Sequence, residues 1–198
     1  MDKPQVFIKK IPDILPRDRV YPKERQDEID ASGSLKVKCE KYWSWKLLEL
    51  AAERVTSKSF TSLSFEKQDT GRWVCSDFDF SISHSGSFAA VIISESSCGI
   101  DIEAYRPLTS GVESKMLTKK ELEEYGAIDD IREKEAYLIR KWTKKEAIFK
   151  SLDKRALMPT AIESSDYCVS SRDISLGGKA FCLSVFAKDC DGYEMTVL

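Results

Sequence analysis

The stretch that decides the fold is Cys98-Gly99-Ile100-Asp101-Ile102-Glu103, in the middle of the chain. Its apolar and acidic residues alternate, and side chains two positions apart on a β-strand lie on one face, so Asp101 and Glu103 are expected to project together. Two carboxylates held that close repel each other unless a cation lies between them. Mg²⁺ suits such a pair, because it binds one or two carboxylates and completes its coordination with water and phosphate oxygens. The same alternation is also typical of a half-buried edge strand whose acids face water.

Length and composition limit what the chain can be. Its 198 residues, 42% hydrophobic and 32% charged, suffice for one large domain or two small ones with a buried core. The 31 basic and 33 acidic residues give a net charge of −2, which gives no reason to expect a nucleic-acid partner. No stretch approaches the roughly 20 apolar residues of a membrane span, and the N-terminus lacks the apolar core of a signal peptide. We therefore expect a cytoplasmic protein without a membrane partner.

The cysteine and histidine content narrows the chemistry. The six cysteines form no C-x-x-C pair and have no partner histidines, which predicts reduced, mostly buried thiols and no disulfide framework. The single histidine, His84, excludes most zinc sites and every mechanism that needs several histidines.

Hydrophobic periodicity and turn residues predict the elements. Strands are expected at 6–11, 78–83, 88–93, 99–103, 167–176, 180–187 and 193–198, and helices at 39–55, 118–126 and 131–152. The second helix opens with the capping-box sequence Thr118-Lys119-Lys120-Glu121, and Gly177-Gly178 and Asp191-Gly192 are each expected to turn a hairpin. This order predicts two halves of similar length, 1–98 and 99–198, which meet near Gly99.

The longest predicted helix carries Trp142, Glu146 and Lys150 along one side. Glu146 and Lys150 stand one turn apart with the acid first, an arrangement that by itself indicates a surface ion pair worth about 0.3–0.5 kcal/mol. A lone histidine is likewise more often structural than catalytic. The hypothesis of a site therefore depends on the combination of Ser83-His84-Ser85, the 98–103 stretch and this helix face.

These three stretches resemble the motifs of the 4′-phosphopantetheinyl transferases, in particular the larger, surfactin-synthetase-activating type. That family's motifs read approximately S-H-S, then G-[IV]-D-[IV]-E and, some forty residues later, W-[ST]-x-K-E-[SA]-x-x-K. All three occur here in order, and Glu146 follows Glu103 by 43 residues. The resemblance spans roughly residues 70–198. It departs from the family at Gly71-Arg72-Trp73, where many members carry Gly-Lys-Pro.

The resemblance implies an α+β fold, a pseudo-twofold arrangement of two similar α/β halves with antiparallel sheets, and coenzyme A in the cleft between them. It implies a monomeric enzyme that moves the 4′-phosphopantetheine arm of coenzyme A onto a serine hydroxyl of an apo carrier protein and releases 3′,5′-ADP. By position, it assigns magnesium ligands to Asp101, Glu103 and Glu146, catalytic phosphate contacts to Lys150 and His84, and further coenzyme A contacts to Ser83 and Arg72. The N-terminal basic residues align poorly with the family, and Arg25 and Lys41 are our candidates for the 3′-phosphate side.

This chemistry also makes sense from the residues alone. A divalent cation bridging a diphosphate neutralises the charge that develops when a serine attacks phosphorus. A carboxylate must take the serine proton, and Glu146 is the candidate, directly or through a metal-bound water. We expect Lys144 and Lys145 beside it to lower its pKa, which suits a ligand better than a base.

Two alternative functions use the same residues. A magnesium-dependent hydrolase of coenzyme A or nucleotide diphosphates needs the same ligands with water as the nucleophile, and a non-catalytic module would bind coenzyme A or carriers without turnover. For a transferase, the family's carriers usually present an acidic helix beside the target serine. We then expect carrier docking at the basic and apolar face around Lys115, Lys119 and Lys120 and along the long helix, although such lysines are equally typical of a solvated helix.

Overall fold

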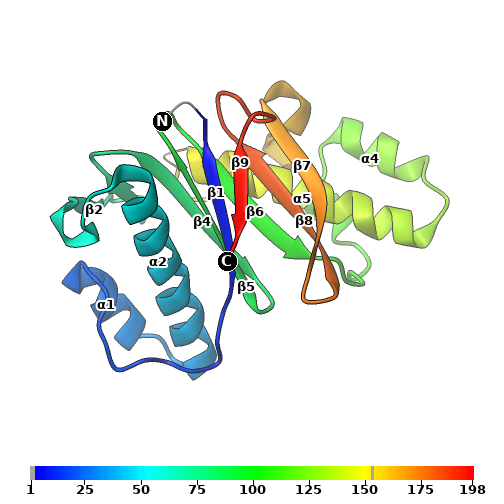
Figure 1. Ribbon diagram of the computed structural model, residues 1–198. Helices are drawn as coiled ribbons and strands as arrows, with labels where there is room; N and C mark the ends of the chain where they lie inside the picture. The colour runs from blue at the N-terminus through cyan, green and yellow to red at the C-terminus, as the bar shows by residue number, and fades with distance from the viewer. Residues whose placement is uncertain (1–2, 153) are drawn as a thin grey trace.

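The computed structural model describes residues 3–152 and 154–198 (Figure 1). Its strands are β1 (Gln5–Lys10), β2 (Phe65–Lys67), β3 (Trp73–Cys75), β4 (Asp79–Ser85), β5 (Phe88–Ser94), β6 (Gly99–Ala104), β7 (Val169–Leu176), β8 (Lys179–Phe186) and β9 (Glu194–Val197). Its helices are α1 (Lys23–Asp30), α2 (Leu35–Thr56), α3 (Glu113–Met116), α4 (Lys119–Gly126) and α5 (Ile131–Ser151), and short 3-10 turns lie at Phe60–Ser62, Pro159–Ala161 and Ser164–Asp166.

Two sheets form the framework of the fold. One has the strand order β4-β5-β1-β9 and the other β6-β8-β7, while β2 and β3 pair as a separate hairpin. Paired strands are antiparallel except β1 and β9, which run parallel. The long helix α2 packs on the first sheet and the long helix α5 on the second (Figure 1). The fold is therefore α+β, as the resemblance implied, and its sheets are antiparallel apart from the β1–β9 pair.

The chain passes from the first sheet to the second between β5 and β6, close to the predicted division at residue 98. One strand lies outside this division. β9 returns to the first sheet and pairs with β1, with Gln5 opposite Glu194 and Ile8 opposite Val197. The hairpin expected at Asp191-Gly192 is therefore not formed, because β8 and β9 belong to different sheets. The two-half organisation therefore remains a proposal, in which the last strand of the C-terminal half completes the sheet of the N-terminal half.

The helices follow local signals in most places. α2 begins four residues earlier than predicted because the Ser34 side chain accepts the N–H of Val37 (3.3 Å) and caps it. α4 has the predicted capping box, and α5 has nearly the predicted bounds. α1 was not predicted because Ile29 is its one apolar residue. Among the described helices, none combines the length and the apolar composition that a bilayer crossing requires.

Apolar side chains fill two main cores. In one, α2 packs Trp45 and Leu48 against the first sheet. In the other, Ile8 of the first sheet meets Ile100 and Val185 of the second. Because this second core is shared, the two sheets form one body, and it brings the edge strands β4 and β6 together.

The backbones of β6 and α5 approach each other closely at Gly99. A Cβ at this position would lie 1.8 Å from the carbonyl oxygen of Ala147 and 3.2 Å from the backbone nitrogen of Ser151. Glycine alone fits, since it has no Cβ. The contact sets the acids of β6 beside the part of α5 that carries Glu146 and Lys150.

One pair of cysteines contradicts the expectation of reduced thiols. Cys168 and Cys190 form a disulfide, with Cα atoms 5.7 Å apart. The reason is tertiary: Cys168 precedes β7 and Cys190 follows β8, and the antiparallel pairing of these strands brings the two positions together. The remaining cysteines are free, namely Cys39, Cys75, Cys98 and Cys182.

Candidate active site

The candidate site lies where the edge strands β4 and β6 face each other. The hydroxyl of Ser83 donates a hydrogen bond to Asp101 Oδ1 (2.7 Å), and the hydroxyl of Ser85 donates one to Glu103 Oε2 (2.8 Å). Side chains of β4 therefore contact both predicted acids of β6. The alternation in β6 does place these two acids on one face, toward its neighbour strand, rather than in open water.

The two oxygens of Asp101 have different surroundings. The residue is 5% exposed, and Oδ1 accepts hydrogen bonds both from Ser83 and from Lys150 Nζ (2.7 Å). Oδ2 is buried and has no partner among the described residues. A buried carboxylate oxygen without a partner is costly, and a cation at that point would satisfy it.

Glu146 lies on α5, close enough to the two β6 carboxylates for their charges to act on it. Withdrawal from water raises its pKa; Lys150 opposes that rise, and the two carboxylates add to it. The expectation that Lys144 and Lys145 lower the pKa of Glu146 is therefore wrong in direction, because burial and neighbouring acids outweigh the cations.

Lys145 points away from the site into the C-terminal half. It is fully buried, and its Nζ forms an ion pair with Glu121 (2.5 Å), which is fully buried too. The same Nζ donates hydrogen bonds to the carbonyl oxygens of Met116 and Pro159 (2.8 Å each). Lys145 therefore connects α5 to α3, to α4 and to the 3-10 turn at Pro159–Ala161.

The three acids fit a magnesium ion by their chemistry. Asp101, Glu103 and Glu146 offer only carboxylate oxygens, the donors that hard divalent cations prefer, and one oxygen of Asp101 lacks a partner. Within residues 3–152 and 154–198, no group of three acids, histidines or cysteines is close enough to hold a metal ion by itself. Mg²⁺ usually takes part of its coordination from water and phosphate oxygens.

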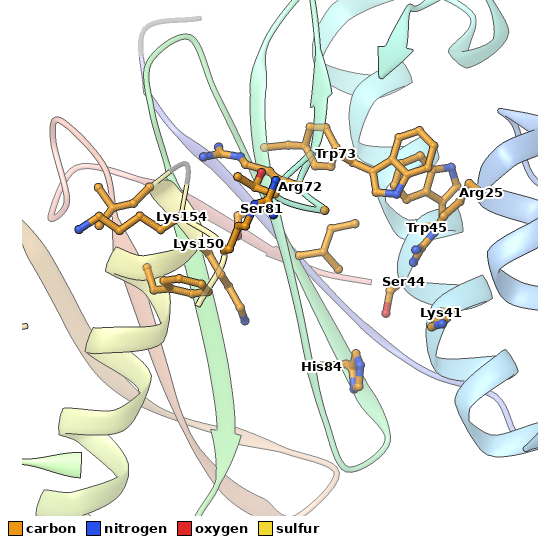
Figure 2. Close-up of a pocket in the computed structure, with 17 residues that line it drawn as sticks. Arg25, Lys41, Ser44, Trp45, Arg72, Trp73, Ser81, His84, Lys150 and Lys154 are labelled. Carbon is orange, nitrogen blue, oxygen red and sulfur yellow. The ribbon is translucent and has the colours of Figure 1, made fainter. Parts of the chain in front are cut away.

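A basic cleft of about 470 Å³ opens beside the acids. The predicted coenzyme A contacts Arg25, Lys41, Arg72, His84 and Lys150 all line it (Figure 2). They come from α1, α2, the turn before β3, β4 and α5, so tertiary structure gathers residues up to 125 positions apart. A concave surface lined by so many cations attracts a polyanionic ligand.

Three polar atoms of the cleft residues are buried and have no partner in the described part of the chain: Arg25 Nε, Ser44 Oγ and Arg72 Nε. The remainder of each guanidinium is engaged, Arg72 with Asp79 (2.6 Å) and Arg25 with Glu28 (2.7 Å). Native proteins leave few buried polar groups unpaired. These atoms therefore point to a polar ligand in the cleft.

His84 lies on the wall of the cleft. Withdrawal of its ring from water lowers its pKa below the ordinary 6.5, and Lys150 adds to the decrease. The carboxylates of Glu40, Asp101 and Glu103 act in the opposite direction. A bound phosphate would favour the charged ring, because an opposite charge stabilises the ionised form.

Trp73 stands where many family members have proline, and it forms an aromatic end to the cleft. Its ring packs edge-to-face against Trp45, with centroids 5.3 Å apart, and its Nε1 donates to Glu28 (3.4 Å). The guanidinium carbon of Arg25 lies 5.0 Å from the Trp45 ring centroid. The departure from the family therefore replaces a turn residue with an aromatic wall.

Sequence reasoning missed Lys154, Arg155 and Ser44 as cleft residues. Lys154 and Arg155 could have been predicted from the sequence, because they follow Lys150 closely after the end of α5 and extend its positive charge. Ser44 carried none, since nothing local distinguishes it. Ser83 is 5% exposed and its hydroxyl faces Asp101 instead of the cleft, so its assignment to coenzyme A stays a prediction.

Comparison with known families identifies one that matches the C-terminal half of the sequence. The family model described as the 4′-phosphopantetheinyl transferase superfamily matches residues 97–197. That range contains Asp101, Glu103, Glu146 and Lys150. No curated protein matches the sequence. Because the family model covers just over half of the chain, including β6 and α5, the chain belongs to the 4′-phosphopantetheinyl transferase superfamily.

Proposed function

We propose that this chain transfers the 4′-phosphopantetheine moiety of coenzyme A to a serine hydroxyl of an apo carrier protein and releases 3′,5′-ADP, in a magnesium-dependent reaction. Lys150 carries this proposal, because it lines the basic cleft and also bonds Asp101 (2.7 Å), so the cationic and acidic parts of the site share one residue. Two sheets, each with a long helix, support the larger, surfactin-synthetase-activating type. The proposed enzyme is monomeric and cytoplasmic.

Coenzyme A matches the cleft by charge. Its diphosphate would lie between His84 and Lys150, next to the acids, and its 3′-phosphate on the side of Arg25 and Lys41. Arginine grips phosphate through two parallel hydrogen bonds, and lysine adds a point charge. The unpartnered Nε of Arg25 supports this assignment.

Asp101, Glu103 and Glu146 would hold the magnesium ion. When bound, it would neutralise the negative charge of the diphosphate as serine attacks. Lys150 forms an ion pair with Asp101 (2.7 Å) and so offsets part of the negative charge that the three acids bring together.

The transfer exchanges one phosphorus–oxygen bond for another. The serine oxygen bonds to the phosphorus that carries pantetheine, while the bond from that phosphorus to the bridging diphosphate oxygen breaks. Glu146 takes the serine proton as the general base. Lys150 and His84 donate hydrogen bonds to the leaving 3′,5′-ADP.

We place the carrier on the other side of Glu103. A second cavity of about 400 Å³ begins at Glu103, is mainly apolar, and has Arg106 and Lys115 among its lining residues. Met116 and Trp142 contribute apolar walls. An acidic amphipathic helix matches such a surface by charge and shape. Lys119 and Lys120 are exposed on α4 nearby in sequence and extend the basic face. The carrier would serve fatty acid, polyketide or nonribosomal peptide synthesis.

Intact mass spectrometry of an apo carrier protein incubated with this chain, coenzyme A and Mg²⁺ tests the proposal. We expect the carrier to gain one phosphopantetheine arm, and a chelator to prevent the gain. Asp101→Ala and Glu146→Ala should abolish transfer and leave the fold intact, while Glu66→Ala, at an exposed position of β2 that lines neither cavity, should transfer normally. A near-normal rate in either acid variant would refute the assigned roles.

The same experiment separates the alternatives. Consumption of coenzyme A with no modified carrier, across several carrier types, would favour the hydrolase. Neither consumption nor modification would leave a module that binds coenzyme A or carriers. All three predicted acids are present, which argues against loss of activity.

A further inference from the structure

We propose that Ser83 and Ser85 are positioning residues, each of which occupies one oxygen of a β6 carboxylate and so leaves the other oxygen to a divalent cation. This inference rests on the proposed function, because it concerns how the acids of that site are presented. It gives a role to the S-H-S motif that differs from contact with coenzyme A.

The same bonding unit occurs twice along the seam between β4 and β6. Ser83 Oγ donates to Asp101 Oδ1 (2.7 Å) and accepts from the N–H of Ile102 (3.3 Å). Ser85 Oγ donates to Glu103 Oε2 (2.8 Å) and accepts from the N–H of Ala104 (3.1 Å). Each hydroxyl thus fixes both a carboxylate and the backbone that follows it. A hydroxyl can do this because it is donor and acceptor at once.

Hydrogen bonds from side chains of β4 to the backbone of β6 take the place of the backbone–backbone hydrogen bonds that join strands within a sheet. β4 and β6 belong to different sheets and are edge strands there, so the N–H groups of β6 that face β4 need other partners. Asp79 supplies a similar partner just before β6, since its Oδ2 accepts the N–H of Cys98 (2.8 Å). Side chains of β4 therefore set the register of β6, and the register sets where the acids lie.

As a result, the two carboxylate oxygens of Asp101 differ in their hydrogen bonding. Oδ1 is shared by Ser83 and Lys150, while Oδ2 is buried and has no partner within the described residues. If Ser83 did not hold Oδ1, the carboxylate could rotate and satisfy Oδ2 with Lys150 or water. The serine therefore keeps one oxygen oriented for an external cation. Partners that orient metal ligands in this way typically account for about 10–100-fold in metal affinity.

Binding of Mn²⁺, as a paramagnetic substitute for Mg²⁺, tests the inference without any turnover. Electron paramagnetic resonance would measure the Kd of Mn²⁺ for the protein saturated with 3′,5′-ADP, whose phosphate can complete the coordination, and calorimetry would measure the Kd of 3′,5′-ADP without metal. We expect Ser83→Ala and Ser85→Ala to raise the Kd of Mn²⁺ about 10–100-fold. The Kd of 3′,5′-ADP should change less than about twofold, because neither side chain lines the cleft.

Two further variants separate positioning from general damage. Ser85 is half-buried, so Ser85→Thr keeps the hydroxyl and should restore the affinity for Mn²⁺. Ser94→Ala removes a buried strand hydroxyl that bonds Ser96 instead of an acid, and should bind Mn²⁺ like the wild type. Circular dichroism would confirm that each variant is folded.

The outcomes decide between the roles. Unchanged Mn²⁺ affinity in Ser83→Ala and Ser85→Ala, or weaker 3′,5′-ADP binding instead, would overturn the inference and favour a direct ligand contact. Failure of Ser85→Thr to restore binding would also count against it. A wild-type protein that neither transfers nor binds Mn²⁺ would refute the proposed function first, and this inference with it.

Discussion

Replacement of Gly99 by alanine tests the contact between β6 and α5. A Cβ at position 99 would lie 1.8 Å from the carbonyl oxygen of Ala147 and 2.9 Å from its carbonyl carbon. Both are backbone atoms, so no side-chain rotation can relieve the overlap. Since such contacts are essentially never shorter than 3.0 Å, the two elements would have to part by at least about 1.2 Å.

That displacement reaches the site, because Asp101 lies two residues after Gly99 and Glu146 and Lys150 flank Ala147. The bond between Lys150 and Asp101 is 2.7 Å long, and a further 1.2 Å or so would take it beyond hydrogen-bonding range. Overpacking typically costs about 1–3 kcal/mol of folding free energy. A misplacement of about 1 Å can cost about 100-fold in rate. We therefore expect Gly99→Ala to lose about 1–3 kcal/mol of folding free energy and about 100-fold in transfer rate.

Urea denaturation would measure the free energy of unfolding, and mass spectrometry of the carrier would measure the transfer rate. Gly126→Ala is the matched control, because a Cβ at Gly126 meets nothing within 4 Å. Wild-type stability and rate in Gly99→Ala would refute the reasoning. A destabilised variant with full activity would show that the contact serves the fold and not the site.

Three other predictions follow from burial, charge and covalent linkage. The pKa of His84 lies below 6.5 in the free protein, and a bound phosphate would raise it. 3′,5′-ADP should therefore bind more tightly, with proton uptake, as the pH falls from about 8 to about 6. Calorimetry in two buffers would measure the proton uptake, and His84→Gln should lose that share of the pH dependence. Lys145→Met should lower the free energy of unfolding by about 3–5 kcal/mol, because Glu121 would keep a buried charge without its closest partner. Urea denaturation would measure this loss in Lys145→Met and in the double variant Lys145→Met/Glu121→Gln. If the double variant is no more stable than Lys145→Met, the broken ion pair is not the cause of the loss. Alkylation of the unfolded protein without reductant should label four of the six cysteines, and Cys168→Ser should cost about 2–4 kcal/mol; six labelled thiols would show that Cys168 and Cys190 are not joined.

Local patterns determined most of the elements. The capping box at Thr118, the periodicity of 131–152 and the glycines at 177–178 each predicted a structure that depends on neighbours only a few residues away, and α4, α5 and the β7–β8 hairpin are where these signals indicate. α1 was not predicted because it is highly charged, and the β2–β3 hairpin was not predicted because strands of three residues are too short to show a periodicity. The motifs also identified the family, since their order and spacing are properties of the sequence.

Tertiary structure alone decided how the candidate site is assembled. The sequence placed Lys145 next to Glu146, yet the helix turns Lys145 into the core and Glu146 toward the acids, which reversed the expected pKa shift. It separated Ser83 from Asp101 by 18 residues, and the packing of two sheets joined them. It left Arg155 unassigned, and the fold brought it to the cleft of Arg25 and Lys41. The physical reason is the same in each case: burial, charge and hydrogen bonding depend on which surfaces pack together, and that packing minimises the free energy of the whole chain instead of any single segment.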